Sequence, residues 1–230
     1  MKRIFPLSPL TTLMLMSFTK ERKETLYPRI VKTIKGYTEE FDQIPEARKK
    51  ALKKLALFVE EKVNARENAE LIFKCTHNSR RSHISQIWAQ AAAAYYEIPN
   101  VICCSGGTEA TAFNPRAVKA MEAVGFKITK TSEGTNPLYE VRYADDVTPV
   151  KAFSKKYDGE GNPKAGFAAV MTCSHADQNC PTVTGATVRL SIPYDDPKEF
   201  DGTAQEAAKY DERVHQIGRE VLYAFSLVKT

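Results

Sequence analysis

The chain has 230 residues, of which 43% are hydrophobic and 27% are charged, and its formal net charge is +5. These values are typical of a water-soluble globular protein with one domain and an appendage. The charge is small and no run of Lys and Arg is long, so nucleic-acid binding is not expected, whereas small anions are suitable ligands. Five cysteines, an odd number, do not indicate the disulfide framework of a small secreted domain and favour a reduced, cytoplasmic setting.

Residues 1–18 carry two basic residues followed by a short apolar stretch, which is the order found in signal peptides. Pro6 and Pro9 interrupt this stretch, and no cleavage site of small residues follows it. The stretch is also too short to span a bilayer, so no membrane association is expected. We predict that these residues form a disordered tail, or that they lie upstream of a true start at Met14 or Met16.

Residues 19–68 are rich in Lys and Glu, and their pattern predicts helices. Within residues 45–63, apolar side chains recur at helical spacing with lysines on the other face, and Pro45 suits the first turn. The apolar positions are Ala51, Leu55, Leu57, Phe58 and Val63. We expect a helical extension that packs on the main domain.

Residues 69–230 change to alternating strands and helices, which predicts one α/β domain. The expected strands are residues 71–73, 101–104, 126–128, 168–172 and 188–192, and the expected helices are residues 82–96, 114–124 and 204–228. Residues 133–166 are rich in Gly, Pro, Asn and Lys, and we expect them to form a long irregular insertion. The alternation predicts a parallel sheet with helices on both faces. Ligands of such sheets bind beyond the carboxyl ends of the strands, where Cys75 and Cys173 both fall.

Cys75 lies at the end of an expected strand, before a short polar loop and a helix. Backbone N–H groups in such a loop form a site for anions, and they stabilise a thiolate, which lowers a cysteine pKa from near 8.5 toward roughly 3.5–7.5. Arg81 can offer a planar fork of donors to a tetrahedral oxyanion. The Ser82 hydroxyl can donate to the sulfur, and Asn78 can hold a left-handed turn. We therefore expect an enzyme that acts on oxyanions through Cys75; the alternative is a buried core cysteine.

Residues 72–82, with the sequence IFKCTHNSRRS, resemble the phosphate loop of the low-molecular-weight protein tyrosine phosphatases. They are more similar still to the thioredoxin-coupled arsenate reductases, which share that fold. The resemblance continues through residues 105–107, 114–118, 170–173, 179–181 and 195–197. It covers roughly residues 71–228, apart from the insertion, and leaves residues 1–68 outside. It implies a three-layer α/β fold, like that of the low-molecular-weight phosphatases, with a central parallel sheet and, here, an N-terminal helical extension.

The resemblance also implies the roles of individual residues. Cys75 would be the nucleophile, Arg81 the oxyanion clamp, and Asp196 the general acid on an Asp-Pro loop. The oxyanion-binding loop would consist of Thr76, His77, Asn78, Ser79, Arg80, Arg81 and Ser82. Considered alone, Asp196 sits on a loop stiffened by Pro197, which suits a proton donor, although an ordinary surface turn has the same sequence.

Cys173 and Cys180 match the second and third cysteines of the reductases, with six residues between them. In that family the second cysteine attacks the nucleophile to release arsenite, and the third presents a disulfide to thioredoxin. The segment between them is polar and suits a mobile loop, because thiol exchange needs accessible sulfurs. With only His175 nearby, no metal site is expected. No tightly bound cofactor is expected either, and thioredoxin is the expected reductant.

Several positions depart from the family pattern. His77 replaces a glycine, Arg80 replaces a residue that is often cysteine, and Gln86 replaces an acidic residue of potassium-binding reductases, which puts a potassium site in doubt. Lys198-Glu199 follow the Asp-Pro pair where the phosphatases have aromatic residues, although tyrosines of the insertion could supply a wall for phosphotyrosine. These tyrosines are Tyr139, Tyr143 and Tyr157. We expect Cys103 and Cys104 in the core, and His83 and His215 on helix surfaces.

The leading hypothesis is a cytoplasmic arsenate reductase with a Cys75-Cys173-Cys180 disulfide relay. The alternative is a low-molecular-weight protein tyrosine phosphatase that hydrolyses phosphomonoesters through a Cys75 phosphocysteine, with the other two cysteines protecting the nucleophile. A third hypothesis is a non-catalytic oxyanion or redox sensor. Cys75 and Asp196 together argue against the sensor.

Overall fold

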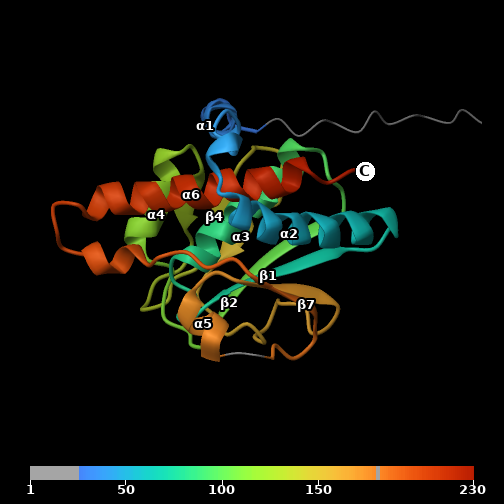
Figure 1. Ribbon diagram of the computed structural model, residues 1–230. Helices are drawn as coiled ribbons and strands as arrows, with labels where there is room; N and C mark the ends of the chain where they lie inside the picture. The colour runs from blue at the N-terminus through green and yellow to red at the C-terminus, as the bar shows by residue number, and fades with distance from the viewer. Residues whose placement is uncertain (1–25, 180–181) are drawn as a thin grey trace, which may run out of the picture.

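The structure is a computed structural model that describes residues 26–179 and 182–230 (Figure 1). The expected tail, residues 1–18, lies outside the described residues, and so does Cys180. Among the residues that are described, no helix is long and apolar enough to cross a membrane.

A parallel sheet forms the centre of the molecule and confirms the expected fold class. Within the described residues its strand order is β2-β1-β6-β7. The strands are β1 (Ala69–Cys75), β2 (Val101–Gly107), β6 (Phe167–Met171) and β7 (Ala186–Ser191). β6 is apolar throughout, and β1 is apolar apart from Glu70 and Lys74. Both strands are buried on both faces except at Glu70, which is partly buried, as is usual for the inner strands of parallel sheets.

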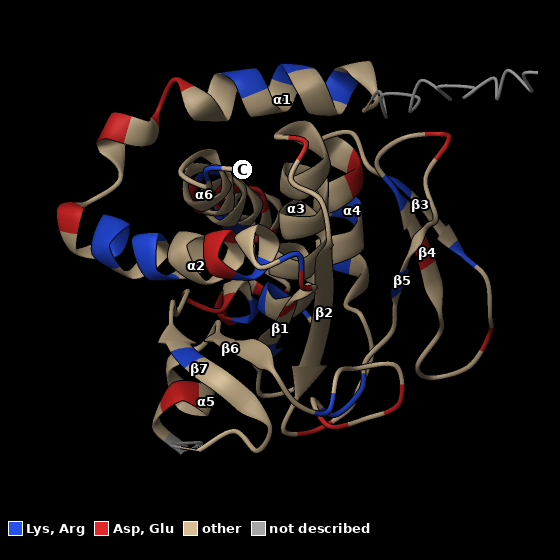
Figure 2. Ribbon diagram, turned by 90° about the vertical axis from the view of Figure 1, so that its right-hand side faces the viewer, with Lys and Arg blue, Asp and Glu red and all other residues tan. Residues whose placement is uncertain are grey.

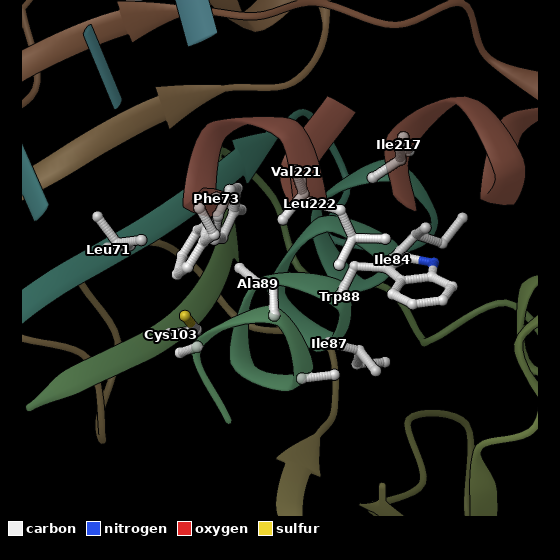
Figure 3. Packing of buried hydrophobic residues seen from close by; sticks show 14 of the residues in the cluster. Leu71, Phe73, Ile84, Ile87, Trp88, Ala89, Cys103, Ile217, Val221 and Leu222 are labelled. Carbon is white, nitrogen blue, oxygen red and sulfur yellow. The ribbon is translucent and has the colours of Figure 1, made fainter. Parts of the chain in front are cut away.

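Helices cover the two faces of the sheet unequally (Figure 2). One face carries α1 (Pro28–Thr38), α2 (Glu46–Asn64), α3 (Arg81–Tyr95), α4 (Pro115–Ala123) and α6 (Glu206–Ser226). The opposite face carries the short helix α5 (Ser174–Asn179) and part of the loop around Tyr157. In Figure 3, Leu71 and Phe73 of β1 point toward α3 and α6, where Ala89 and Leu222 lie. Ile72, between them in sequence, belongs to the smaller cluster on the other face.

The N-terminal helices are part of the main core. Ile30 and Ile34 of α1 and Leu55 of α2 are fully or almost fully buried, and they share one cluster with β1, α3 and α6. A short 3-10 helix, η1 (Phe41–Gln43), connects α1 to α2. From α2, Arg48 donates to the buried carboxylate of Glu220 on α6 (Nε to Oε2, 3.0 Å) and to the Pro193 carbonyl (3.0 Å). The helical segment is therefore packed and hydrogen-bonded against the domain.

The insertion at residues 133–166 is more regular than expected. It contains β4 (Tyr139–Arg142) and β5 (Val150–Ala152), which form an antiparallel sheet with β3 (Lys127–Lys130) in the order β3-β4-β5. The prediction of an irregular insertion was wrong for these strands, and the strand expected at residues 126–128 belongs to this second sheet. The strands are short and separated by residues such as Gly134 that favour turns, so no periodicity is visible in the sequence.

Side chains complete the hydrogen bonds of β2, which is an edge strand of the central sheet. Gln90 Oε1 accepts from the Cys103 N–H (3.1 Å), and its Nε2 donates to the Val101 carbonyl (3.2 Å). Gln86 Nε2 donates to the Cys103 carbonyl (3.0 Å), and Asn162 Nδ2 donates to the Ser105 carbonyl (3.0 Å). An amide side chain can replace a neighbouring strand in this way, so this edge is closed to pairing with another chain.

His83 is buried, so the prediction that it lies on a helix surface was wrong. Its side chain is fully covered, and Nδ1 lies 3.2 Å from the Ser105 hydroxyl. Loss of water around the ring and, second, the positive charge of Lys155 together lower the pKa of His83 to about 3. α3 is buried on most of its circumference, so its sequence has no polar face that would indicate which residues are exposed.

Leu55→Ala tests whether α2 is integral to the core. The Leu55 side chain is 1% exposed, so we expect a loss of about 2–5 kcal/mol in the free energy of unfolding from the cavity that is created. Leu57→Ala on the same helix is the control, because Leu57 is 62% exposed and should change stability by no more than about 0.5 kcal/mol. Equal effects in denaturant titrations would contradict the packing described here.

His83 should make stability depend on pH. Between its unfolded pKa, ordinarily near 6.5, and its folded pKa of about 3, only the unfolded chain binds the proton. The contribution of neutral His83 to the free energy of unfolding is fully present above the unfolded pKa and is lost as pH falls toward 3. In His83→Asn, the slope of unfolding free energy against pH between 4 and 6 should fall by about 1.4 kcal/mol per pH unit. Identical slopes in the two proteins would contradict a neutral, buried imidazole.

Candidate active site

Two cysteine thiols meet at the carboxyl edge of the central sheet. Cys75 is the last residue of β1, and Cys173 follows the end of β6 by two residues. The two strands pair in parallel with Lys74 opposite Met171, and the Thr172 N–H donates to the Lys74 carbonyl (2.7 Å). Both thiols are buried, 3% and 1% exposed, and they belong to the same apolar cluster. The pairing of β1 with β6 therefore brings the two sequence-predicted cysteines to one site.

The loop after Cys75 holds the thiol against a hydroxyl. Asn78 has a φ of 45°, the left-handed conformation expected for it, and its Oδ1 accepts from the Lys155 N–H (2.9 Å). This bond turns Asn78 Nδ2 toward Ser82 Oγ, to which it donates (2.9 Å). Because Ser82 Oγ accepts there, its own proton is free to point at Cys75 Sγ, 3.1 Å away. A hydrogen bond donated to sulfur favours the thiolate.

Arg81 and Asp196 lie at the same site and contact each other. Arg81 Nη2 donates to Asp196 Oδ2 (2.6 Å), and Nη1 donates to the Tyr194 carbonyl (2.8 Å). Arg81 Nε is buried and has no hydrogen-bond partner among the described residues, so it is available to donate to an oxyanion. Asp196 also accepts from the Lys198 N–H (3.2 Å) at the start of a 3-10 helix, η2 (Pro197–Phe200). To act as an acid on a leaving group, Asp196 would have to give up its hydrogen bond with Arg81.

Arg80 connects the loop to α6. Its Nε donates to the Tyr210 hydroxyl (2.7 Å), and its Nη2 donates to Asp201 Oδ2 (3.2 Å). Burial raises the pKa of Tyr210 to about 12, so the phenol stays protonated and donates to Asp201 Oδ1 (2.8 Å). Sequence reasoning missed Tyr210 and Asp201. The only signal was the unusual Arg80, which predicts that an acceptor is nearby without saying where it lies in the chain.

Cys173 is hydrogen-bonded where a mobile loop was expected. Its Sγ accepts from the Ala176 N–H (3.3 Å) and lies 3.6 Å from Thr76 Oγ1. The residues after it form the helix α5 where a loop was expected. α5 is held by Asp177, which pairs with Arg189 of β7 (2.6 Å). Cys180, the expected third cysteine, lies outside the described residues.

The carbonyls of the loop are bound by residues of the insertion and its neighbours. The His77 carbonyl accepts from Ser154 Oγ (2.8 Å) and from Thr111 Oγ1 (3.1 Å), and the Ser79 carbonyl accepts from the Asn114 N–H (2.9 Å). The His77 side chain is partly exposed, with Nε2 3.6 Å from Glu109. Residues 133–166 therefore support the loop by direct hydrogen bonds.

The other candidate residues are buried or packed against other side chains. Cys103 and Cys104 are buried, as expected for core residues, and burial raises the pKa of both thiols. Tyr157 lies against the buried ammonium of Lys74 (3.9 Å from ring centre to Nζ), Tyr139 packs on Phe113, and Tyr143 is buried beside β2. These contacts give no support to a phosphotyrosine wall formed by the three tyrosines. In the described part of the chain, no cluster of three or more His, Cys, Asp or Glu could hold a metal ion.

No family model matches the chain, but named proteins resemble it. An arsenate reductase of Bacillus cereus strain 03BB102 is 30% identical over 158 residues, which are 66% of this chain and 98% of that protein. The arsenate reductase of Bacillus subtilis strain 168 is 29% identical over 156 residues, 67% of this chain and 94% of that protein. The arsenate reductase of Halalkalibacterium halodurans is 28% identical over 152 residues, 66% of this chain and 91% of that protein.

Solved structures of low-molecular-weight phosphatases also match. The Vibrio cholerae O395 enzyme has a TM-score of 0.47 at 12% identity, covering 68% of this chain and 94% of that one. The enzyme of T. tengcongensis has a TM-score of 0.45 at 13% identity, covering 67% of this chain and 95% of that one. From its identity to reductases that it covers almost completely, the chain belongs to the arsenate reductase family.

Proposed function

We propose that the protein reduces arsenate to arsenite with Cys75, Cys173 and Cys180. The observation that carries the proposal is the place of Cys173, a second buried thiol with its sulfur 3.6 Å from Thr76 of the nucleophile's own loop. Hydrolysis of a phosphomonoester needs no second thiol, whereas reduction of arsenate by cysteine ends in a disulfide. The names of the curated relatives support the same choice.

In the first step the Cys75 thiolate attacks arsenic and displaces a hydroxide or water, which forms a sulfur–arsenic bond. Ser82 stabilises the thiolate, and the free Nε of Arg81 is a donor for an arsenate oxygen. The ion pair with Asp196 and the bond to the Tyr194 carbonyl fix the guanidinium before the substrate binds, so little side-chain entropy is lost on binding.

In the second step Cys173 attacks Cys75 Sγ. A sulfur–sulfur bond forms, the sulfur–arsenic bond breaks, and its electron pair stays on arsenic, which leaves as arsenite in the trivalent state. The two cysteines lose two electrons and arsenic gains two. Cys180, seven positions after Cys173, then attacks Cys173 and releases Cys75.

A dithiol protein must reduce the Cys173–Cys180 disulfide to complete the cycle, and we propose thioredoxin in a cytoplasmic setting. Reduced thioredoxin supplies the two electrons and becomes a disulfide itself. Cys173 and Cys180 have the spacing of the second and third cysteines in the thioredoxin-coupled reductases, which supports both Cys180 and thioredoxin. No other cofactor is required by this cycle.

A phosphatase is the second candidate, because Asp196 lies beside Arg81 at the same site. Cys75 would form a phosphocysteine with a phosphomonoester while Asp196 protonates the leaving oxygen. A non-catalytic oxyanion or redox sensor is the third candidate, and it would bind phosphate without turning over any substrate.

Arsenate-dependent oxidation of NADPH in the presence of thioredoxin and thioredoxin reductase distinguishes these functions. Wild type should turn over arsenate, and Cys180→Ser should lose this turnover while it still hydrolyses 4-nitrophenyl phosphate. Cys103→Ala is the control, because it removes a buried thiol that has no role in the relay. Hydrolysis of the aryl phosphate without arsenate turnover in wild type would reject the reductase in favour of the phosphatase, and phosphate binding without any turnover would favour the sensor.

A further inference from the structure

Three side chains line up from a buried thiol to the surface. Cys173 Sγ lies 3.6 Å from Thr76 Oγ1, and the same hydroxyl lies 3.3 Å from His175 Nδ1. Cys173 is 1% exposed, Thr76 is partly exposed, and His175 is exposed at the second residue of α5. The order of burial follows the order of the contacts, so the three groups form a path from the interior to solvent.

Cys173 needs such a path because the thiolate, and not the thiol, is the nucleophile in disulfide formation. A sulfur that is covered by protein cannot pass its proton directly to bulk water. The Ala176 N–H already donates to the sulfur (3.3 Å), so this contact stabilises a thiolate but cannot take a proton from the thiol. Among the contacts of Cys173 with the described residues, only the Thr76 hydroxyl can both accept a proton and donate one.

We propose that His175 takes the thiol proton of Cys173 through the Thr76 hydroxyl, and so prepares Cys173 for its attack on Cys75. This inference rests on the proposed reductase function. The Cys173 proton moves to Thr76 Oγ1 while the Thr76 proton moves to His175 Nδ1. The sulfur keeps its electron pair, and the imidazole becomes an imidazolium. His175 thus acts through Thr76, as a positioning residue for the second step.

The chemistry of the groups fits these roles. For His175 to accept at Nδ1, its proton must be on Nε2, and an exposed ring can later release the extra proton to solvent. His77, the other histidine of this region, has Nε2 3.6 Å from the carboxylate of Glu109. Thr76 Oγ1 contacts His175 Nδ1 (3.3 Å), and this contact makes His175 the acceptor.

The test is the rate of arsenite release in a single turnover, measured in the Cys180→Ser protein so that the reaction stops at the Cys75–Cys173 disulfide. His175→Gln can accept a hydrogen bond but not a proton at neutral pH. We expect it to slow arsenite release by about 100-fold, the lower end of general acid–base effects. His175→Ala should be slowed similarly, and added imidazole should restore much of its rate, which a purely structural role for His175 would not allow.

Gln178→Ala is the matched control, because Gln178 is exposed on the same short helix and is not part of the path. It should release arsenite at the rate of the Cys180→Ser parent. An unchanged rate in His175→Gln would overturn the proposal, and so would a slow His175→Ala that imidazole does not rescue. A parent protein that releases no arsenite at all would instead reject the proposed reductase function, so the two failures are distinguishable.

Discussion

The parallel pairing of β1 with β6 is the constraint on which the site depends. Parallel strands present their carboxyl ends at one edge of a sheet, so residues almost one hundred positions apart meet there. The Thr172 N–H and hydroxyl both donate to the Lys74 carbonyl (2.7 and 2.9 Å), which fixes the segment after β6 against the end of β1. Cys75 directly follows Lys74, and Cys173 directly follows Thr172. The register of the sheet therefore brings the two cysteines together, and no other interaction is needed for this.

The remaining parts of the molecule support the ends of these strands. The insertion binds the loop through Ser154, Lys155 and their neighbours, and Asn162 and Gln86 close the edge of β2 beside it. From the opposite side, α2 reaches the Pro193 carbonyl through Arg48, just before the segment that carries Asp196. A catalytic loop supported by other elements keeps its geometry without substrate, which is what preorganised oxyanion binding requires. The N-terminal helices and the insertion thus serve the site as well as the core.

The sequence predicted the main strands, the long helices and the loop of Cys75, because each carries a local signal. Apolar runs mark β1 and β6, helical spacing marks α2, and a polar loop between a strand and a helix marks the oxyanion site. The antiparallel strands β4 and β5 were missed because four residues or fewer give too little periodicity. His83 was placed on the surface because α3 lacks a polar face. The Arg80–Tyr210 contact spans 130 positions, and no local pattern encodes a partner at that separation.

If Cys75 and Cys173 react in sequence, they form a disulfide with each other, and this bond is the most direct product to detect. Cys180→Ser protein would be incubated with arsenate, its free thiols alkylated, and its peptides mapped by mass spectrometry. We predict a disulfide between Cys75 and Cys173, with one arsenite released for each disulfide. Fully alkylated Cys75 and Cys173 after exposure to arsenate, in a protein that still hydrolyses an aryl phosphate, would contradict it.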